Sequence, residues 1–156
     1  MTTFDRAFAV VIGHEGDLSD DPRDPGGLTR YGISKRAHPT VDVRNLTLAQ
    51  AKQIYLERYW LPLHADAMPE AVAVQVFDAA VNHGIKPAIR MMQRALRVQD
   101  DGRIGPVTLQ AMTTVDDARF AARFAAERLM FYADLSSWPA FGRGWVRRVA
   151  SNLRQA

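Results

Sequence analysis

The sequence contains no cysteine among its 156 residues, which excludes disulfide bonds, a catalytic thiol and thiolate metal ligands. It has no apolar run as long as a membrane-spanning helix requires, and its first residues lack the basic start and apolar core of a signal peptide. Patterns that predict strands are nearly absent. We therefore expect synthesis in the cytosol and a core built from helices.

Net charge is also small, because 20 basic side chains oppose 17 acidic ones, and lysine is much rarer than arginine. Four of the arginines lie in residues 143–154, which contain no acid. A mildly basic protein suits an anionic polymer, whether cell wall, nucleic acid or lipid, but charge alone selects none of them. For the tail we predict an amphipathic helix packed on the domain with its basic face in solvent. Contact of that face with an anionic membrane is the less favoured alternative.

Apolar residues at three- and four-residue spacing predict helices along most of the chain. Their expected starts are Phe4, a capping box of Thr47 and Gln50, Pro69, Pro87, Pro106, Asp116 or Asp117, and a point beyond the break at Trp138-Pro139. No tandem repeat or flexible linker separates them. The pattern predicts an all-α, multi-helix single domain with a weak boundary near Gly84, so that 1–84 and 85–156 pack as one compact unit.

Residues 17–30 interrupt the helical pattern directly after the first helix. They are rich in aspartate, proline and glycine, so no regular element runs through all of them. Weak alternation from Leu28 to Ile33 allows a short β-hairpin at the end of this segment. An apolar helix followed by a carboxylate and a long polar loop is an arrangement that can hold an acid at the wall of a cleft.

Glu15 is the candidate acid. Cleavage of a glycosidic bond needs a protonated acid beside the leaving oxygen and a second carboxylate or a held water across the ring. Glu15 suits the first role because it follows an apolar helix face, and apolar surroundings raise the pKa of a carboxyl group. Candidates for the second role are Asp20, Asp21, Asp24 and the hydroxyl of Thr29. The alternative is that Glu15 is a solvated helix end and the aspartates only form turns.

Two ordered motifs resemble glycoside hydrolase family 108, whose members are N-acetylmuramidases found largely as phage and prophage endolysins. The first consists of Glu15-Gly16, Asp21-Pro22, Asp24-Pro25-Gly26-Gly27, Thr29 and Tyr31-Gly32-Ile33-Ser34, and is joined by residues 77–84. The second, residues 92–96 and 101–108, resembles the peptidoglycan-binding segment of that family. The order of helix, glutamate, loop, aspartate and threonine is also similar to phage-type lysozymes.

The resemblance implies a lysozyme-like fold in which 1–84 form the catalytic region and 85–156 the peptidoglycan-binding-like region. It implies that Glu15 is the general acid and that Thr29 positions water or substrate. Asp24 is the first choice for the base or charge stabiliser. Asp21 is the second choice and a candidate substrate contact. No cofactor is implied, and the four histidines lack the spacing of metal ligands.

Further substrate contacts are expected from Tyr31, Asn82 and His83. Each has an alternative, because an aromatic at helical spacing is commonly part of the core and a polar residue at a helix end is commonly a cap. Asp78 interrupts an apolar helix face and is expected to be the buried partner of an arginine, with Arg128 as the candidate.

The activity implied by the resemblance is hydrolysis of the β-1,4 bond between N-acetylmuramic acid and N-acetylglucosamine in bacterial peptidoglycan, for lysis of a host cell. It implies release through a holin-like pore and action in the periplasm. We expect a monomer that does not bind nucleic acid. The alternative is a non-catalytic peptidoglycan-binding protein of the same fold, because Asp17 stands where the family has a second glycine.

Overall fold

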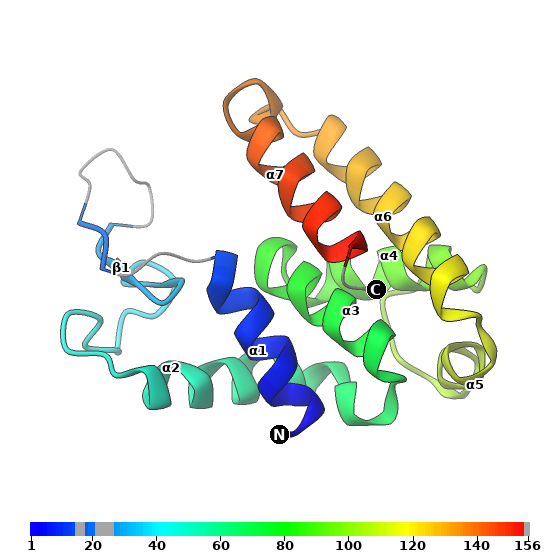
Figure 1. Ribbon diagram of the computed structural model, residues 1–156, viewed down its shortest axis with the longest axis horizontal. Helices are drawn as coiled ribbons and strands as arrows, with labels where there is room; N and C mark the ends of the chain where they lie inside the picture. Colours follow the sequence, from blue (N-terminus) through cyan, green and yellow to red (C-terminus); the bar gives the residue numbers. More distant parts are fainter. Residues whose placement is uncertain (15–17, 21–26, 155–156) are drawn as a thin grey trace.

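The computed structural model describes residues 1–14, 18–20 and 27–154 (Figure 1). Its elements in chain order are α1 (Thr3–His14), β1 (Thr29–Arg30), β2 (Ile33–Ser34), α2 (Leu48–Tyr55), α3 (Glu70–His83), α4 (Ile85–Leu96), α5 (Pro106–Thr114), α6 (Asp117–Ala133) and α7 (Trp138–Leu153). A π-helical turn (Leu56–Trp60) and two 3-10 turns (Leu61–Leu63 and Ala65–Ala67) connect α2 to α3. The prediction of a mostly all-α fold with one short hairpin is confirmed.

Local sequence signals set several helix ends as expected. The Thr47 hydroxyl accepts a hydrogen bond from the backbone N–H of Gln50, whose side chain accepts one from the N–H of Thr47, so the capping box is formed. Asp116 caps α6 by accepting from the N–H of Arg119 at 2.9 Å. Gly84 separates α3 from α4 with a φ of 88°, a conformation that favours glycine.

Two helix starts differ from the sequence prediction. The helix α4 begins at Ile85, two residues before Pro87, and α7 begins at Trp138 rather than beyond the Trp138-Pro139 pair. In both helices the proline lies in the first turns, where its missing N–H would have no partner inside the helix. These prolines therefore mark the beginnings of helices without being their first residues.

The core is arranged around α3, which contacts α1, α4 and α6. In the middle of α3 the ring of Phe77 lies 5.9 Å from that of Phe4 and 5.4 Å from that of Trp60. All three rings are buried, and such aromatic pairs contribute more than their buried area alone. This cluster holds the first turn of α1 against α3 and fixes the direction in which α1 points.

One buried carboxylate joins α3 to α6 and α7. Asp78 is fully buried, with its Oδ2 atom 2.7 Å from Arg128 Nη1, which confirms the expected pair. Arg148 Nε donates to Asp78 Oδ1 at 2.9 Å, and Asn152 Nδ2 donates to Oδ2 at 2.7 Å. Burial acts to raise the pKa of Asp78, but the two guanidinium groups outweigh it and lower that pKa. The carboxylate is therefore charged and ties the last two helices to the first half of the chain.

The ring of His83 lies beside this network, at the end of α3. Its centroid is 4.8 Å from the ring centroids of both Phe131 and Tyr132 on α6, and its Nε2 atom is buried without a hydrogen-bond partner. Burial, and then the charge of Arg128, lower the pKa of His83 to about 3, although Asp78 opposes the shift. His83 is therefore neutral at ordinary pH.

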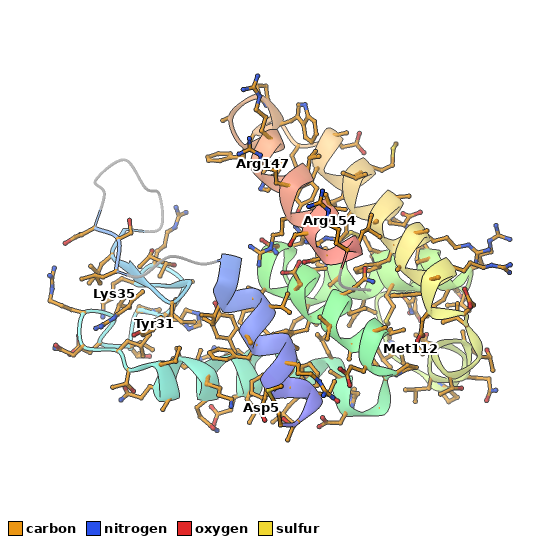
Figure 2. The ribbon with its side chains drawn as sticks, viewed as in Figure 1. Asp5, Tyr31, Lys35, Met112, Arg147 and Arg154 are labelled. Carbon is orange, nitrogen blue, oxygen red and sulfur yellow. The ribbon has the colours of Figure 1, made fainter. Side chains whose placement is uncertain are left out.

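The α7 helix packs on α6 as an amphipathic helix, which confirms the prediction for the tail. Val149 is buried, and the ring of Trp145 stacks on that of Tyr132 with centroids 4.7 Å apart. Arg147 and Arg154, both labelled in Figure 2, are exposed. No helix within the described ranges is long and apolar enough to span a membrane.

The motif at residues 92–108 forms an internal hydrogen-bond cluster. The side-chain Nε2 of the buried Gln93 donates to Asp101 Oδ1 at 2.8 Å and lies 3.2 Å from Thr108 Oγ1. Its Oε1 accepts from the N–H of Gly102, which has a φ of 77°. Gln93 thus fastens the loop between α4 and α5.

Substitution Asp78→Asn should lower the free energy of unfolding by about 3–5 kcal/mol, because it keeps the shape of the side chain but leaves the buried Arg128 without a counter-charge. Urea denaturation measures this change. The matched control is Asp100→Asn, whose ion pair with Arg94 is nearly half exposed and should contribute at most about 1 kcal/mol. Equal losses in the two variants would contradict the role given to Asp78.

His83 should make the fold less stable as the pH falls from 6.5 towards 3, because in this range the unfolded chain binds a proton that the folded chain does not. The free energy of unfolding should fall by up to about 1.4 kcal/mol per pH unit in the range where only the unfolded chain binds the proton. In His83→Phe, urea denaturation at pH 4.5–7 should give a flatter profile than in the parent chain. Parallel profiles would show that His83 is not the group responsible.

Candidate active site

The β-hairpin stands on the far side of α1 from α6 and α7, as Figure 1 shows, and the chain reaches it after α1 ends at His14. Thr29 pairs with Ser34 and Arg30 with Ile33. Ser19 and Thr29 also exchange two backbone hydrogen bonds, each of 2.8 Å. Residues 18–20 are therefore fixed to the hairpin, and Ser19 and Thr29 lie side by side although ten positions separate them in the sequence.

The hairpin turn is made by Tyr31 and Gly32, which have φ values of 50° and 74°. Two residues with positive φ match the twist of the flanking strands, but this conformation strains a residue other than glycine by about 1–3 kcal/mol. The hydroxyl of Tyr55 on α2 donates to the carbonyl of Tyr31 at 3.0 Å, and the guanidinium of Arg30 lies 5.3 Å from the Tyr31 ring centroid. These contacts hold the strained residue in place.

Thr29 lies at the base of the loop, half-buried, where the sequence places a water-holding hydroxyl. Its Oγ1 donates to the carbonyl of Gly27 at 3.0 Å. A hydroxyl has one hydrogen to donate and two lone pairs, so this bond leaves Oγ1 able to accept from water or a sugar hydroxyl. The hydrogen bond to Gly27 therefore orients the Thr29 hydroxyl and leaves its lone pairs available to a second partner.

Three of the carboxylates named from the sequence, Glu15, Asp21 and Asp24, lie outside the described residues. Asp20 is described: it is exposed and forms an ion pair with Arg44 at 3.0 Å. This exposed pair links the base of the loop to the segment before α2. It does not decide the second carboxylate, which stays a prediction among Asp20, Asp21 and Asp24.

The two candidates at the end of α3 face different surroundings. Asn82 is half-buried, and its Nδ2 donates to the carbonyl of Asp78 at 2.8 Å, so the amide folds back on its own helix. The ring of His83 packs against Phe131 and Tyr132 of α6, on the side of the later helices. The structure thus brings Thr29 and Tyr31 together on the hairpin and places His83 with α6.

Tyr55 is a positioning residue that the sequence pattern did not single out. It is 1 % exposed and belongs to the apolar face of α2, which is how the sequence presents it. The signal that could have identified it is its hydroxyl, since a buried tyrosine in an apolar face needs a hydrogen-bond acceptor. Here that acceptor is the carbonyl of Tyr31, the least relaxed position of the hairpin.

In residues 1–14, 18–20 and 27–154, no group of three or more histidine, aspartate or glutamate side chains is placed to hold a metal ion.

Comparisons with protein families and with solved structures identify the family of this chain. Residues 8–84 match the family described as "Glycosyl hydrolase 108", and residues 87–150 match one described as "Predicted Peptidoglycan domain". The solved structure of SagA from Brucella abortus is 32% identical, with a TM-score of 0.88, over 98% of this chain and 92% of that chain. No curated protein gives a significant match. The chain belongs to glycoside hydrolase family 108 and is a peptidoglycan hydrolase.

Proposed function

We propose that the enzyme is an N-acetylmuramidase that cleaves the β-1,4 bond between N-acetylmuramic acid and N-acetylglucosamine, with Glu15 as the general acid. The observation that carries the proposal is the position of Glu15 in the chain. It follows the last residue of α1, a helix packed into the core, and precedes a loop whose base is closed on Thr29. The family match over residues 8–84 includes both parts.

The buried row on α1 supports an acid with a raised pKa. Phe4, Phe8 and Val11 are 7 %, 6 % and 0 % exposed, and Glu15 follows Val11 by four residues, the interval at which helical side chains repeat on one face. A carboxyl group next to such a row resists ionisation, because burial disfavours its charged form. A protonated carboxyl group is what the leaving oxygen of a glycosidic bond requires.

For the second function we propose Asp24, with Asp21 as the alternative. Both lie in the segment between Ser19 and Thr29, whose two ends are joined by the paired hydrogen bonds. Asp24 comes first because Asp24-Pro25-Gly26-Gly27 leads to Thr29 in the motif that resembles the family. Thr29, with lone pairs left on Oγ1, would hold the attacking water or a sugar hydroxyl.

The biological setting that we propose is the lysis of a host cell. The enzyme would leave the cytoplasm through a holin-like pore and act as a monomer on the wall in the periplasm. Support for this setting comes from the resemblance of the two motifs to endolysins. Tyr31 on the hairpin, and Asn82 and His83 at the end of α3, would contact the glycan.

Substitution Glu15→Gln should reduce the release of soluble fragments from purified peptidoglycan by about 10²–10⁴-fold, because the protons of an amide are not acidic enough to be transferred to the leaving oxygen. Binding to insoluble peptidoglycan, measured by sedimentation, should persist. Asp24→Asn should reduce the rate more than Asp21→Asn.

The control for this series is Glu57→Gln on the exposed turn after α2, where Glu57 Oε1 accepts from Gln53 Nε2 at 2.7 Å. It should retain the parental rate. An undiminished rate in Glu15→Gln would show that Glu15 is not the general acid. A larger loss in Asp21→Asn than in Asp24→Asn would assign the role of second carboxylate to Asp21.

The cleaved bond is identified by the new chain end. Borohydride reduction of the digest should convert the terminal sugar to muramitol, since a muramidase leaves N-acetylmuramic acid at the reducing end. Recovery of glucosaminitol would show cleavage of the other glycosidic bond. Fragments with no reducing end would show that the reaction is not hydrolysis.

A further inference from the structure

The outward side of α7 carries two rows of exposed side chains, one cationic and one apolar. The arginine row consists of Arg143, Arg147 and Arg154, and the apolar row consists of Trp138, Val146 and Leu153. Spacings of four, seven and eight residues keep the members of each row on one side of a helix. The apolar side chains are between 36 % and 42 % exposed. Arg147 and Arg154 project from α7 in Figure 2.

The arginine row has no counter-charge on its own helix. The sequence of α7 contains no aspartate or glutamate, and the nearest preceding acid is Asp134, nine positions before Arg143. In the part of the chain that the structure describes, no carboxylate forms an ion pair with these three arginines, whereas Arg148 of the same helix pairs with Asp78. Like charges four residues apart on a helix repel one another, so the row favours an anionic partner.

A groove of about 300 Å³ lies where the two rows meet. Its lining residues are Trp138, Gly142, Arg143, Val146 and Arg147. The ring of Trp138 lies directly against Gly142, where an added Cβ atom would be 2.7 Å from a ring atom. The missing side chain at Gly142 therefore lets the indole pack against the helix, and the groove combines this ring with two cations.

We propose that this face of α7 docks on the surface of a lipid bilayer that contains anionic lipids. The phosphate groups of such lipids would pair with the arginines. The boundary between headgroups and acyl chains would cover the indole and the two aliphatic side chains. Helices that lie in this boundary carry arginine or lysine beside tryptophan and leucine, and long arginine stems keep the charge among the headgroups.

The apolar row distinguishes a lipid surface from other anionic partners. The carboxylates of peptidoglycan or the phosphates of a nucleic acid would pair with the arginines alone, because these polymers offer no hydrocarbon layer to Val146 and Leu153. Exposed apolar side chains gathered on one face are typical of an interaction site, whereas isolated ones need no explanation. A bilayer is an anionic partner that uses both rows.

Docking on lipid requires no change of the fold. The inner side of α7 packs on α6 through Val149 and is tied to Asp78 of α3 through Asn152. The hairpin stands on the far side of α1 from α7 (Figure 1), so lipid on α7 would leave the hairpin accessible. The membrane would thus hold the enzyme beside the peptidoglycan layer. This role rests on the proposed function, but the binding itself does not require hydrolysis.

The test is co-sedimentation of the full chain with vesicles of phosphatidylcholine that contain phosphatidylglycerol. The protein should bind these vesicles, dissociate as the salt concentration rises, and ignore vesicles of phosphatidylcholine alone. No binding to the anionic vesicles, or equal binding to both compositions, would overturn the inference. Glu15→Gln should bind as the parent chain does, so failure of the proposed acid and failure of the membrane contact are distinguishable.

The double substitution Arg143→Gln and Arg147→Gln should weaken binding by about 25-fold, because each arginine at an anionic surface contributes about fivefold. The matched control is Arg119→Gln and Arg123→Gln, which removes the same charge at the same spacing from α6. The control should leave binding nearly unchanged. Equal losses in the two variants would show that net charge, and not this face of α7, attracts the protein to the vesicles.

The apolar row is tested by Val146→Ser with Leu153→Ser, which should weaken binding by about tenfold. The matched control is Val107→Ser with Leu48→Ser, which changes the same residue types on α5 and α2 and should have no effect. All four side chains are exposed, so the melting temperature should stay nearly constant in both variants. If the arginine variant weakens binding and the apolar variant does not, the partner is a hydrated polyanion such as peptidoglycan and the lipid proposal is wrong.

Discussion

The structure depends on the buried carboxylate of Asp78 and the two arginines that neutralise it. Arg128 comes from α6 and Arg148 from α7, so one side chain of α3 fixes both later helices. Ion pairs of this kind add little net stability compared with apolar packing, but they strongly penalise arrangements that leave one charge alone. Their effect here is to select a single docking of α6 and α7 on α3.

Two sets of contacts hold α1 and the hairpin in place. The aromatic cluster of Phe4, Trp60 and Phe77 sets the direction of α1, and Tyr55 holds the strained turn of the hairpin. Loops often carry function when rigid elements hold both of their ends. In this enzyme α1 ends at His14, directly before the segment with the predicted acid, and the pairing of Ser19 with Thr29 follows it.

The sequence predicted features that depend on neighbouring residues and missed those that depend on tertiary contacts. The capping box at Thr47 and the cap at Asp116 are local and were predicted correctly. The Asp78–Arg128 pair could also be predicted, since a charge on an apolar face requires a partner. Arg148 and the Tyr55 hydroxyl could not, because no periodicity tells which distant group they reach. For the site, the hairpin and Thr29 were located, while the roles of Glu15, Asp21 and Asp24 stay predictions.

The motif that resembles a peptidoglycan-binding segment has a structural role in this fold. Gln93, Asp101, Gly102 and Thr108 bind one another, and Gln93 is almost fully buried. Their hydrogen bonds are satisfied within the loop between α4 and α5, which leaves the buried amide little capacity for a ligand. These residues build the turn between α4 and α5. Contact with peptidoglycan therefore depends on residues other than these four.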